Sequence, residues 1–165
     1  MRKKAAEAPS DASQRLRGTI AGMADRTRGY AHRVDIAVHP ELVWTALTST
    51  EALERWCSPR ASMSARPGGL FRASVDRITE LEARIDVFEP ARRLRLIYLP
   101  LPNLPPAESA IVDDFMLDSA AGETILRLLG SGIPGDPAWD GLYVRLRVGW
   151  ERAVTRLKVL IETPG

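Results

Sequence analysis

Residues 136–162, DPAWDGLYVRLRVGWERAVTRLKVLIE, decide the fold class of this 165-residue chain. Asp136 can cap a helix, and Pro137 suits the first helical position because a proline there leaves no backbone N–H unsatisfied. From Trp139 to Leu160, large apolar residues recur every three or four positions with charged residues between them. This period predicts one long amphipathic helix, ending near Glu162, that lies along one face of a sheet.

The region before this helix predicts an antiparallel sheet, because short alternating segments follow one another with only turns between them. The clearest segment is 80–87, in which charged and apolar residues alternate without exception. Weaker or shorter alternation marks further segments at 61–65, 71–75, 94–98, 111–117 and 124–129. The spacing predicts a meander of about six strands.

One strand and two short helices are predicted ahead of the meander. Residues 33–38 alternate with period two, and Pro40 ends that strand and opens a helix over 41–47. The segment 48–50 can cap a second helix over 51–56. Together these elements predict an α+β fold, in which a curved antiparallel sheet of about six to seven strands wraps around the C-terminal helix and leaves a cavity between them.

Composition narrows the class of protein. Hydrophobic residues make up 45% of the chain and charged residues 27%, which is typical of a globular protein. Cys57 is the single cysteine, and neither it nor the histidines His32 and His39 fall at a metal-ligand spacing, so no metal or cofactor is expected. No apolar run is long enough for a membrane span and no secretory signal is present, so a cytoplasmic protein is expected.

The positive charge is concentrated at the N-terminus. Residues 1–30 hold seven basic and three acidic residues, a net +4, whereas residues 31–165 hold 16 basic and 18 acidic residues, a net −2. We expect a basic, partly disordered arm over 1–30 and one folded domain over 31–163. The sequence does not decide whether a short helix forms within 13–30. A nucleic-acid-binding protein would carry a basic face on its folded body, so no nucleic-acid partner is expected.

Several segments, taken in order, resemble one known family. They are IAVHPELVWTALT at 36–48, EALERW at 51–56, PGGLF at 67–71, FEPARRL at 88–94, GETILRL at 122–128 and GW at 149–150. This order resembles the START-like (SRPBCC) helix-grip superfamily, and within it the branch of homologues of the activator of a heat-shock protein's ATPase, over about residues 31–162. The resemblance implies a ligand-sized cavity. Members include lipid carriers, aromatase/cyclases, hydrolases, stress proteins and co-chaperones, so the function stays open.

One position departs from the pattern of this family. Many relatives carry a histidine near the end of the strand over 124–129, where this chain has Gly130. No role of that histidine is therefore transferred to this chain. Gly130 and Gly132 are expected to make the end of the strand more flexible.

The candidate ligand-binding residues are those that the strand and helix periods place toward the cavity. They are Met63, Phe71, Ala73, Val75, Ile85, Leu96, Tyr98, Phe115, Leu126, Leu128, Tyr143, Leu146 and Trp150. Asp113 and Tyr98 are the candidates for catalysis, because Asp113 shares the parity of the inward-facing residues of its strand. The interpretation we favour places Asp113 outside instead, through a bulge or through pairing with Arg95 or Arg127.

Three functions are compatible with these residues. The first is a non-catalytic protein that binds a hydrophobic or amphipathic small molecule, which a cavity filled by its own side chains would contradict. The second is a cyclase or hydrolase-like enzyme that uses Asp113 with Tyr98 or Arg95. The third is a co-chaperone-like interaction protein, which is disfavoured because only about 30 residues precede the domain.

The proline-rich segment 99–106 predicts a loop outside the sheet. Its leucines are costly to expose unless they cover something. We expect Leu101 or Leu104 to contact the C-terminal helix or a second subunit over one end of the cavity near Tyr98, so a homodimer is left open. The alternative is an ordinary connection with singly exposed leucines.

Overall fold

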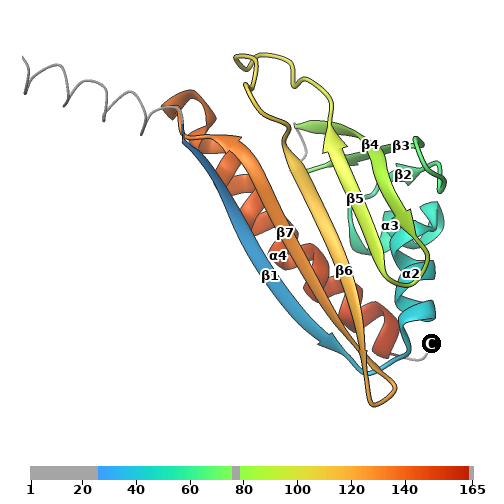
Figure 1. Cartoon of the computed structure of the whole chain (residues 1–165). Coiled ribbons are helices and arrows are strands. Elements are labelled where there is room, and N and C mark those ends of the chain that lie inside the picture. The colour runs from blue at the N-terminus through green and yellow to red at the C-terminus, as the bar shows by residue number, and fades with distance from the viewer. Residues whose placement is uncertain (1–25, 76–78, 164–165) are drawn as a thin grey trace, which may run out of the picture.

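In the computed structural model, which describes residues 26–75 and 79–163, a seven-stranded antiparallel sheet curves around one long helix (Figure 1). The strand order is β1-β7-β6-β5-β4-β3-β2, and every neighbouring pair is antiparallel. The elements are β1 (Thr27–Ile36), α2 (Pro40–Thr48), α3 (Thr50–Trp56), β2 (Ser62–Met63), β3 (Leu70–Ser74), β4 (Glu80–Glu89), β5 (Arg93–Tyr98), β6 (Val112–Ala120), β7 (Glu123–Pro134), η1 (Pro137–Trp139) and α4 (Asp140–Glu162). The predicted α+β helix-grip fold is confirmed.

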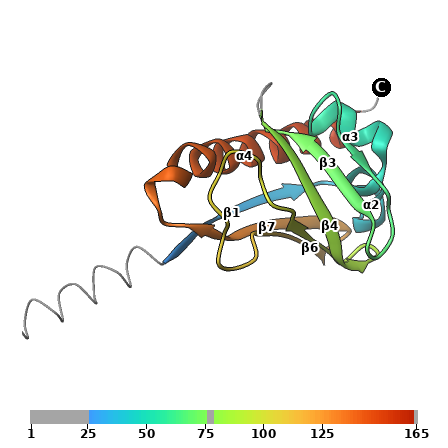
Figure 2. The same cartoon turned by 90° about the horizontal axis from the view of Figure 1, so that it is seen from above.

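The C-terminal helix begins as the sequence predicts. The Asp136 carboxylate accepts the backbone N–H of Ala138 at 2.7 Å, and Pro137 opens a single 3-10 turn that continues into α4. The buried residues of α4 form one stripe, which is Leu142, Leu146, Trp150, Ala153, Val154 and Leu157. Figure 2 shows α4 lying along one side of the sheet, with α3 near its C-terminal end. Burial of this stripe joins the helix to the sheet.

The two short helices also follow local signals. Pro40 stands in the first turn of α2, and the Ser49 side chain accepts the backbone N–H of Ala52 at the start of α3. Both helices pack beside the C-terminal half of α4, and Leu53 and Trp56 of α3 are buried. No helix within the described residues is both long enough and apolar enough to span a membrane.

The first strand starts earlier than its alternation predicts. Residues 27–30 belong to β1, so a helix that includes these four residues is wrong. Residues 13–25 lie outside the described part of the chain. The pairing of β1 with β7 is irregular between Arg28 and Tyr30. This bulge interrupts the period-two pattern, so alternation in the sequence does not mark residues 27–30 as part of the strand.

Glycines lie inside β7 and not at its end. Gly130 pairs with Tyr30 on one side and with Asp113 on the other, and the strand continues to Pro134. Gly132 has φ +82°, and a Cβ there would come within 1.9 Å of the Ala110 carbonyl oxygen. The expected flexible strand end is therefore replaced by a paired strand in which both glycines allow close approach.

The proline-rich loop keeps its leucines partly covered. Leu101 and Leu104 are half-buried and pack against the core, so the alternative with singly exposed leucines is wrong. The positive φ of Asn103 turns the chain between them. Apolar contact with the core offsets the cost of placing leucines in a loop.

Replacing Leu157 by alanine is expected to lower the free energy of unfolding by about 2–5 kcal/mol, because the side chain is fully buried against the sheet. Val159 on the same helix is 58% exposed, so Val159→Ala is expected to change the free energy of unfolding by less than about 0.5 kcal/mol. Urea unfolding followed by far-UV circular dichroism measures both variants. Equal losses would contradict the assignment of helix faces.

Candidate functional site

The space between the sheet and α4 is filled around Trp150. The indole packs against Phe71 with ring centroids 6.3 Å apart and meets Phe115 edge-on at 5.4 Å, and Trp56 lies at 6.5 Å. Eleven of the predicted ligand-binding residues are buried members of this continuous core: Met63, Phe71, Ala73, Ile85, Leu96, Tyr98, Phe115, Leu126, Leu128, Leu146 and Trp150. They belong to one packed cluster, so the cavity expected between sheet and helix is replaced by side chains at these positions.

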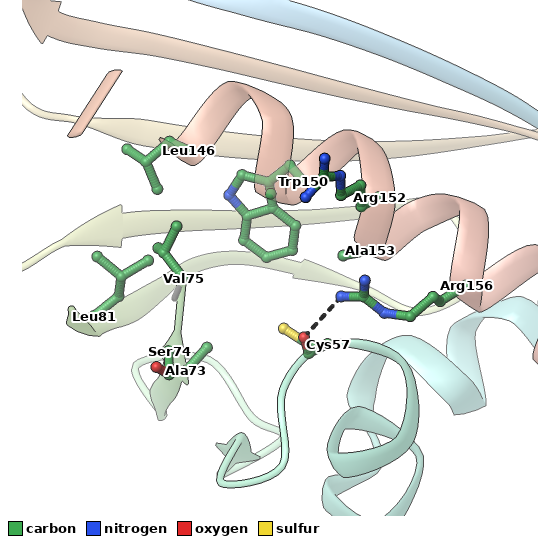
Figure 3. A pocket seen from close by; sticks show the side chains of 11 residues that line it. Cys57, Ala73, Ser74, Val75, Leu81, Leu146, Trp150, Arg152, Ala153 and Arg156 are labelled. Carbon is green, nitrogen blue, oxygen red and sulfur yellow. Dashed lines mark hydrogen bonds between the residues drawn. The ribbon is translucent and has the colours of Figure 1, made fainter. Parts of the chain in front are cut away.

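A pocket of about 160 Å³ lies to one side, where α4 meets the edge of the sheet and the end of α3 (Figure 3). Its described lining residues are Cys57, Ala73, Ser74, Val75, Leu81, Leu146, Gly149, Trp150, Arg152, Ala153 and Arg156. Four predicted residues, namely Ala73, Val75, Leu146 and Trp150, therefore line a pocket. Tyr143 does not, because its hydroxyl donates to the Gly29 carbonyl at 2.9 Å.

The pocket exists because the sheet is incomplete at this edge. Strand β2 has only two residues, which pair with Phe71 and Arg72, so β3 continues past its neighbour toward the pocket. There the Ser58 hydroxyl accepts the backbone N–H of Ser74 at 3.1 Å. On the facing helix, a Cβ at Gly149 would lie 3.4 Å from Val75, so the glycine permits the strand edge to approach α4.

Two arginines of α4 lie at the mouth of the pocket. Arg156 donates to the carbonyl oxygens of Trp56 at 2.9 Å and Cys57 at 3.2 Å, which satisfies the end of α3 and fixes the guanidinium (Figure 3). Arg152 has no hydrogen-bond or ion-pair partner within the described ranges. None of the described lining residues is acidic. The pocket therefore combines an apolar floor with a positively charged mouth.

A larger groove continues from the pocket. Its volume is about 770 Å³, and it shares Cys57, Ala73, Ser74, Val75 and Leu81 with the pocket. The remaining lining residues are Ser58, Pro59, Arg60, Arg72, Glu80 and Glu82. No residue of the proline-rich loop belongs to either described lining, so the loop does not cover this pocket.

Cys57 contributes volume to the pocket and little reactivity. Burial raises the pKa of its thiol to about 12, and the nearby Arg156 offsets this only in part. The thiolate is the nucleophilic form, so at neutral pH the side chain is a protonated, weakly polar group. No cluster of metal-ligating side chains is found among the described residues.

Asp113 lies inside the protein, so the interpretation that placed it outside is wrong. It is fully buried, and its carboxylate accepts the Tyr30 hydroxyl at 2.5 Å and the Tyr98 hydroxyl on its other oxygen. The arginines proposed as its partners point the other way: Arg95 pairs with Asp86 at 3.9 Å, and Arg127 pairs with Asp118 at 2.5 Å. Successive side chains of a strand point to opposite faces of the sheet, and Asp113 lies on the face of β6 that points to the core.

Gly130 makes this arrangement possible. In the sheet register Tyr30 pairs with Gly130 and Gly130 pairs with Asp113, so the tyrosine must reach across β7 to the carboxylate. A Cβ at position 130 would lie 2.3 Å from the Tyr30 ring. Sequence reasoning missed Tyr30 entirely. The signal that could have found it is a glycine inside an alternating strand, which indicates that another group approaches the backbone closely.

Burial raises the pKa of Asp113 to about 6, while hydrogen bonds from Tyr30 and Tyr98 lower it. The indole N–H of Trp150 also favours the ionised carboxylate, although it makes no hydrogen bond of ordinary geometry. Burial and the adjacent carboxylate raise the pKa of both tyrosines, which therefore remain donors. Asp113 is not among the described residues that line the pocket. The geometry thus gives it hydrogen-bond partners but does not bring it to the pocket.

The curved sheet, the long helix held against it and the pocket between helix and sheet edge define a helix-grip protein. Residues 37–162 match the family model described as Activator of Hsp90 ATPase homolog 1-like protein, and the chain belongs to this family. The family resemblance inferred from the motifs is confirmed. A search of the curated proteins finds no significant match.

Solved structures share the fold. The protein MLL2253 from Mesorhizobium loti is 26% identical, with 81% of this chain and 96% of that chain covered and a TM-score of 0.69. The Aha1 dimer from Colwellia psychrerythraea is 18% identical over 82% of this chain and 96% of that chain, with a TM-score of 0.70. CalU16 from Micromonospora echinospora is 23% identical over 82% and 76%, with a TM-score of 0.64.

Asp113 is expected to make stability depend on pH. Its pKa is about 6 in the folded protein against 3.8 for the free group, so the folded state binds more protons between these values. The contribution of Asp113 to stability is therefore lost as pH rises from about 4 to about 6, by about 3 kcal/mol. Between pH 4 and 7 the wild type should therefore lose about 3 kcal/mol of unfolding free energy relative to Asp113→Asn. Urea unfolding of both proteins across this pH range measures the change. A pH-independent difference would contradict the buried carboxyl group.

Gly130→Ala is expected to cost about 1–3 kcal/mol, because the new methyl group overlaps the Tyr30 ring. Much of that loss should disappear in a Tyr30→Ala background, where the ring is absent. A double-mutant cycle from urea unfolding measures the coupling. Equal costs of Gly130→Ala in the two backgrounds would show that the glycine is needed for another reason.

Proposed function

We propose that this protein binds a small amphipathic molecule in the pocket between α4 and the edge of β3. The observation that carries the proposal is the pocket itself, with the Trp150 indole as its floor, aliphatic side chains on its walls and two arginines at its mouth. Small-molecule sites generally combine a mostly apolar lining with a few polar groups that orient the ligand. The side open to the groove provides a route of entry.

The ligand must be small, because side chains fill the space under α4 and leave only the pocket at the sheet edge. The core residues Phe71, Phe115 and Trp150 fill the space beneath the helix, which contradicts binding in an interior cavity there, so the binding proposal rests on the pocket at the sheet edge alone. The remaining pocket of about 160 Å³ is below the roughly 300–1,000 Å³ typical of drug-sized ligands. The proposal therefore concerns a compact molecule at the sheet edge.

The other two hypotheses have less support. An enzyme that uses Asp113 with Tyr98 or Arg95 would need the carboxylate to reach a ligand, and Asp113 does not line the pocket described above. A co-chaperone-like function rests on the family description alone. A homodimer rests on the Colwellia neighbour alone, since Leu101 and Leu104 pack against the core of this chain.

Val75→Phe is expected to abolish binding, because Val75 lines the pocket, is half-buried, and can project a larger ring into the open volume. Val144→Phe is the matched control, since Val144 lies on α4, is 47% exposed and does not line the pocket. Binding is measured by NMR shift changes at the Trp150 indole N–H during titration with small aromatic and aliphatic amphiphiles.

The wild type and Val144→Phe should show saturable shifts with some members of the panel, and Val75→Phe should show none. If no compound shifts the Trp150 resonance of the wild type, the binding proposal fails. If Val75→Phe binds as well as the wild type, the ligand lies elsewhere.

A further inference from the structure

The volume and charge of the pocket restrict its ligand to a narrow chemical class. Resting on the binding function proposed above, we propose that the ligand is a single-ring aromatic carboxylate, with its ring against Trp150 and its carboxylate held at the mouth by Arg152. The size of the pocket indicates a single ring, and the charge of its lining indicates a carboxylate.

The volume admits one ring. A cavity of about 150 Å³ lined by apolar side chains accepts a benzene molecule, and this pocket measures about 160 Å³. Leu81 and Leu146 are buried aliphatic members of the lining. A fused polycycle or a long acyl chain would have to extend into the groove, whose lining carries the charged residues Arg60, Arg72, Glu80 and Glu82.

The floor of the pocket is suited to an aromatic ring. Trp150 is 5% exposed, and its indole is held in place by Phe71 on one side and Phe115 edge-on. An offset stack on a fixed indole adds attraction beyond the apolar area that is buried. Because the indole is already positioned by the core, binding does not have to order it.

The mouth of the pocket selects an anion. Arg156 is pinned by the carbonyl oxygens of Trp56 and Cys57, so its charge stays beside the pocket without being neutralised by an acid. Arg152, one turn earlier on α4, has no described partner, and its planar guanidinium can bind a carboxylate through two parallel hydrogen bonds. With no acidic residue among the described lining, both charges favour the same kind of ligand.

The test compares phenylacetate with its neutral isostere phenylacetamide, using the Trp150 indole N–H as the NMR reporter. Phenylacetate is expected to bind about five- to tenfold more tightly, because part of the charge interaction is exposed to solvent. Arg152→Gln should reduce this preference, mainly through a loss of phenylacetate affinity, while the charge of Arg156 keeps a smaller preference for the acid. Arg55→Gln is the control, since Arg55 is an exposed arginine on α3 that does not line the pocket. Thermal unfolding verifies that both variants fold.

The outcomes separate this inference from the binding function. If acid and amide bind equally to the wild type, or if Arg55→Gln reduces the preference as much as Arg152→Gln, selection of an anion by Arg152 is wrong and the binding function stands. If 2-naphthylacetate binds more tightly than phenylacetate, the restriction to one ring is wrong. If none of the three compounds nor any other amphiphile shifts the Trp150 resonance, the binding function itself fails.

Discussion

The packing of Trp150 is the contact on which the rest of the structure depends. Its indole belongs to the stripe that holds α4 to the sheet, and it touches aromatic residues from the helix pair, from β3 and from β6. A large flat side chain at this junction fills the centre of the molecule. The same ring forms the floor of the pocket, so the contact that closes the interior also provides a surface for a ligand.

Among the described residues, Asp113 is the buried carboxylate of this interior. A buried carboxylate is costly unless its oxygens are hydrogen-bonded, and here each oxygen receives one phenol. The two phenols come from opposite directions in the sheet, Tyr30 from β1 across β7 and Tyr98 from β5. The three side chains therefore link β1, β5 and β6, across β7, by a route other than the backbone ladder. A polar network of this kind favours one register over its alternatives, because a slip by one residue would leave the carboxylate unpaired.

The elements that depend on local signals were predictable. Helix α4 follows from its period and its Asp136 cap, β4 from unbroken alternation, and the start of α2 from Pro40. The features that depend on contacts distant in the sequence were not. Tyr30 and Asp113 are 83 positions apart, and a bulge hides the strand that carries Tyr30. Alternation identifies which residues face inward, but whether they pack together or leave an opening depends on how Trp150 fits among them in three dimensions.

The approach of Tyr30 to Gly130 also restricts how this sequence can change over generations. Any side chain at position 130 would occupy the space of the phenol, and loss of the phenol would leave the carboxylate with one donor fewer. Substitutions at positions 30, 113 and 130 are therefore not independent, and their order matters. A larger residue at position 130 costs least once the aromatic ring at position 30 is gone. The three positions therefore constrain one another, although they lie in three different strands.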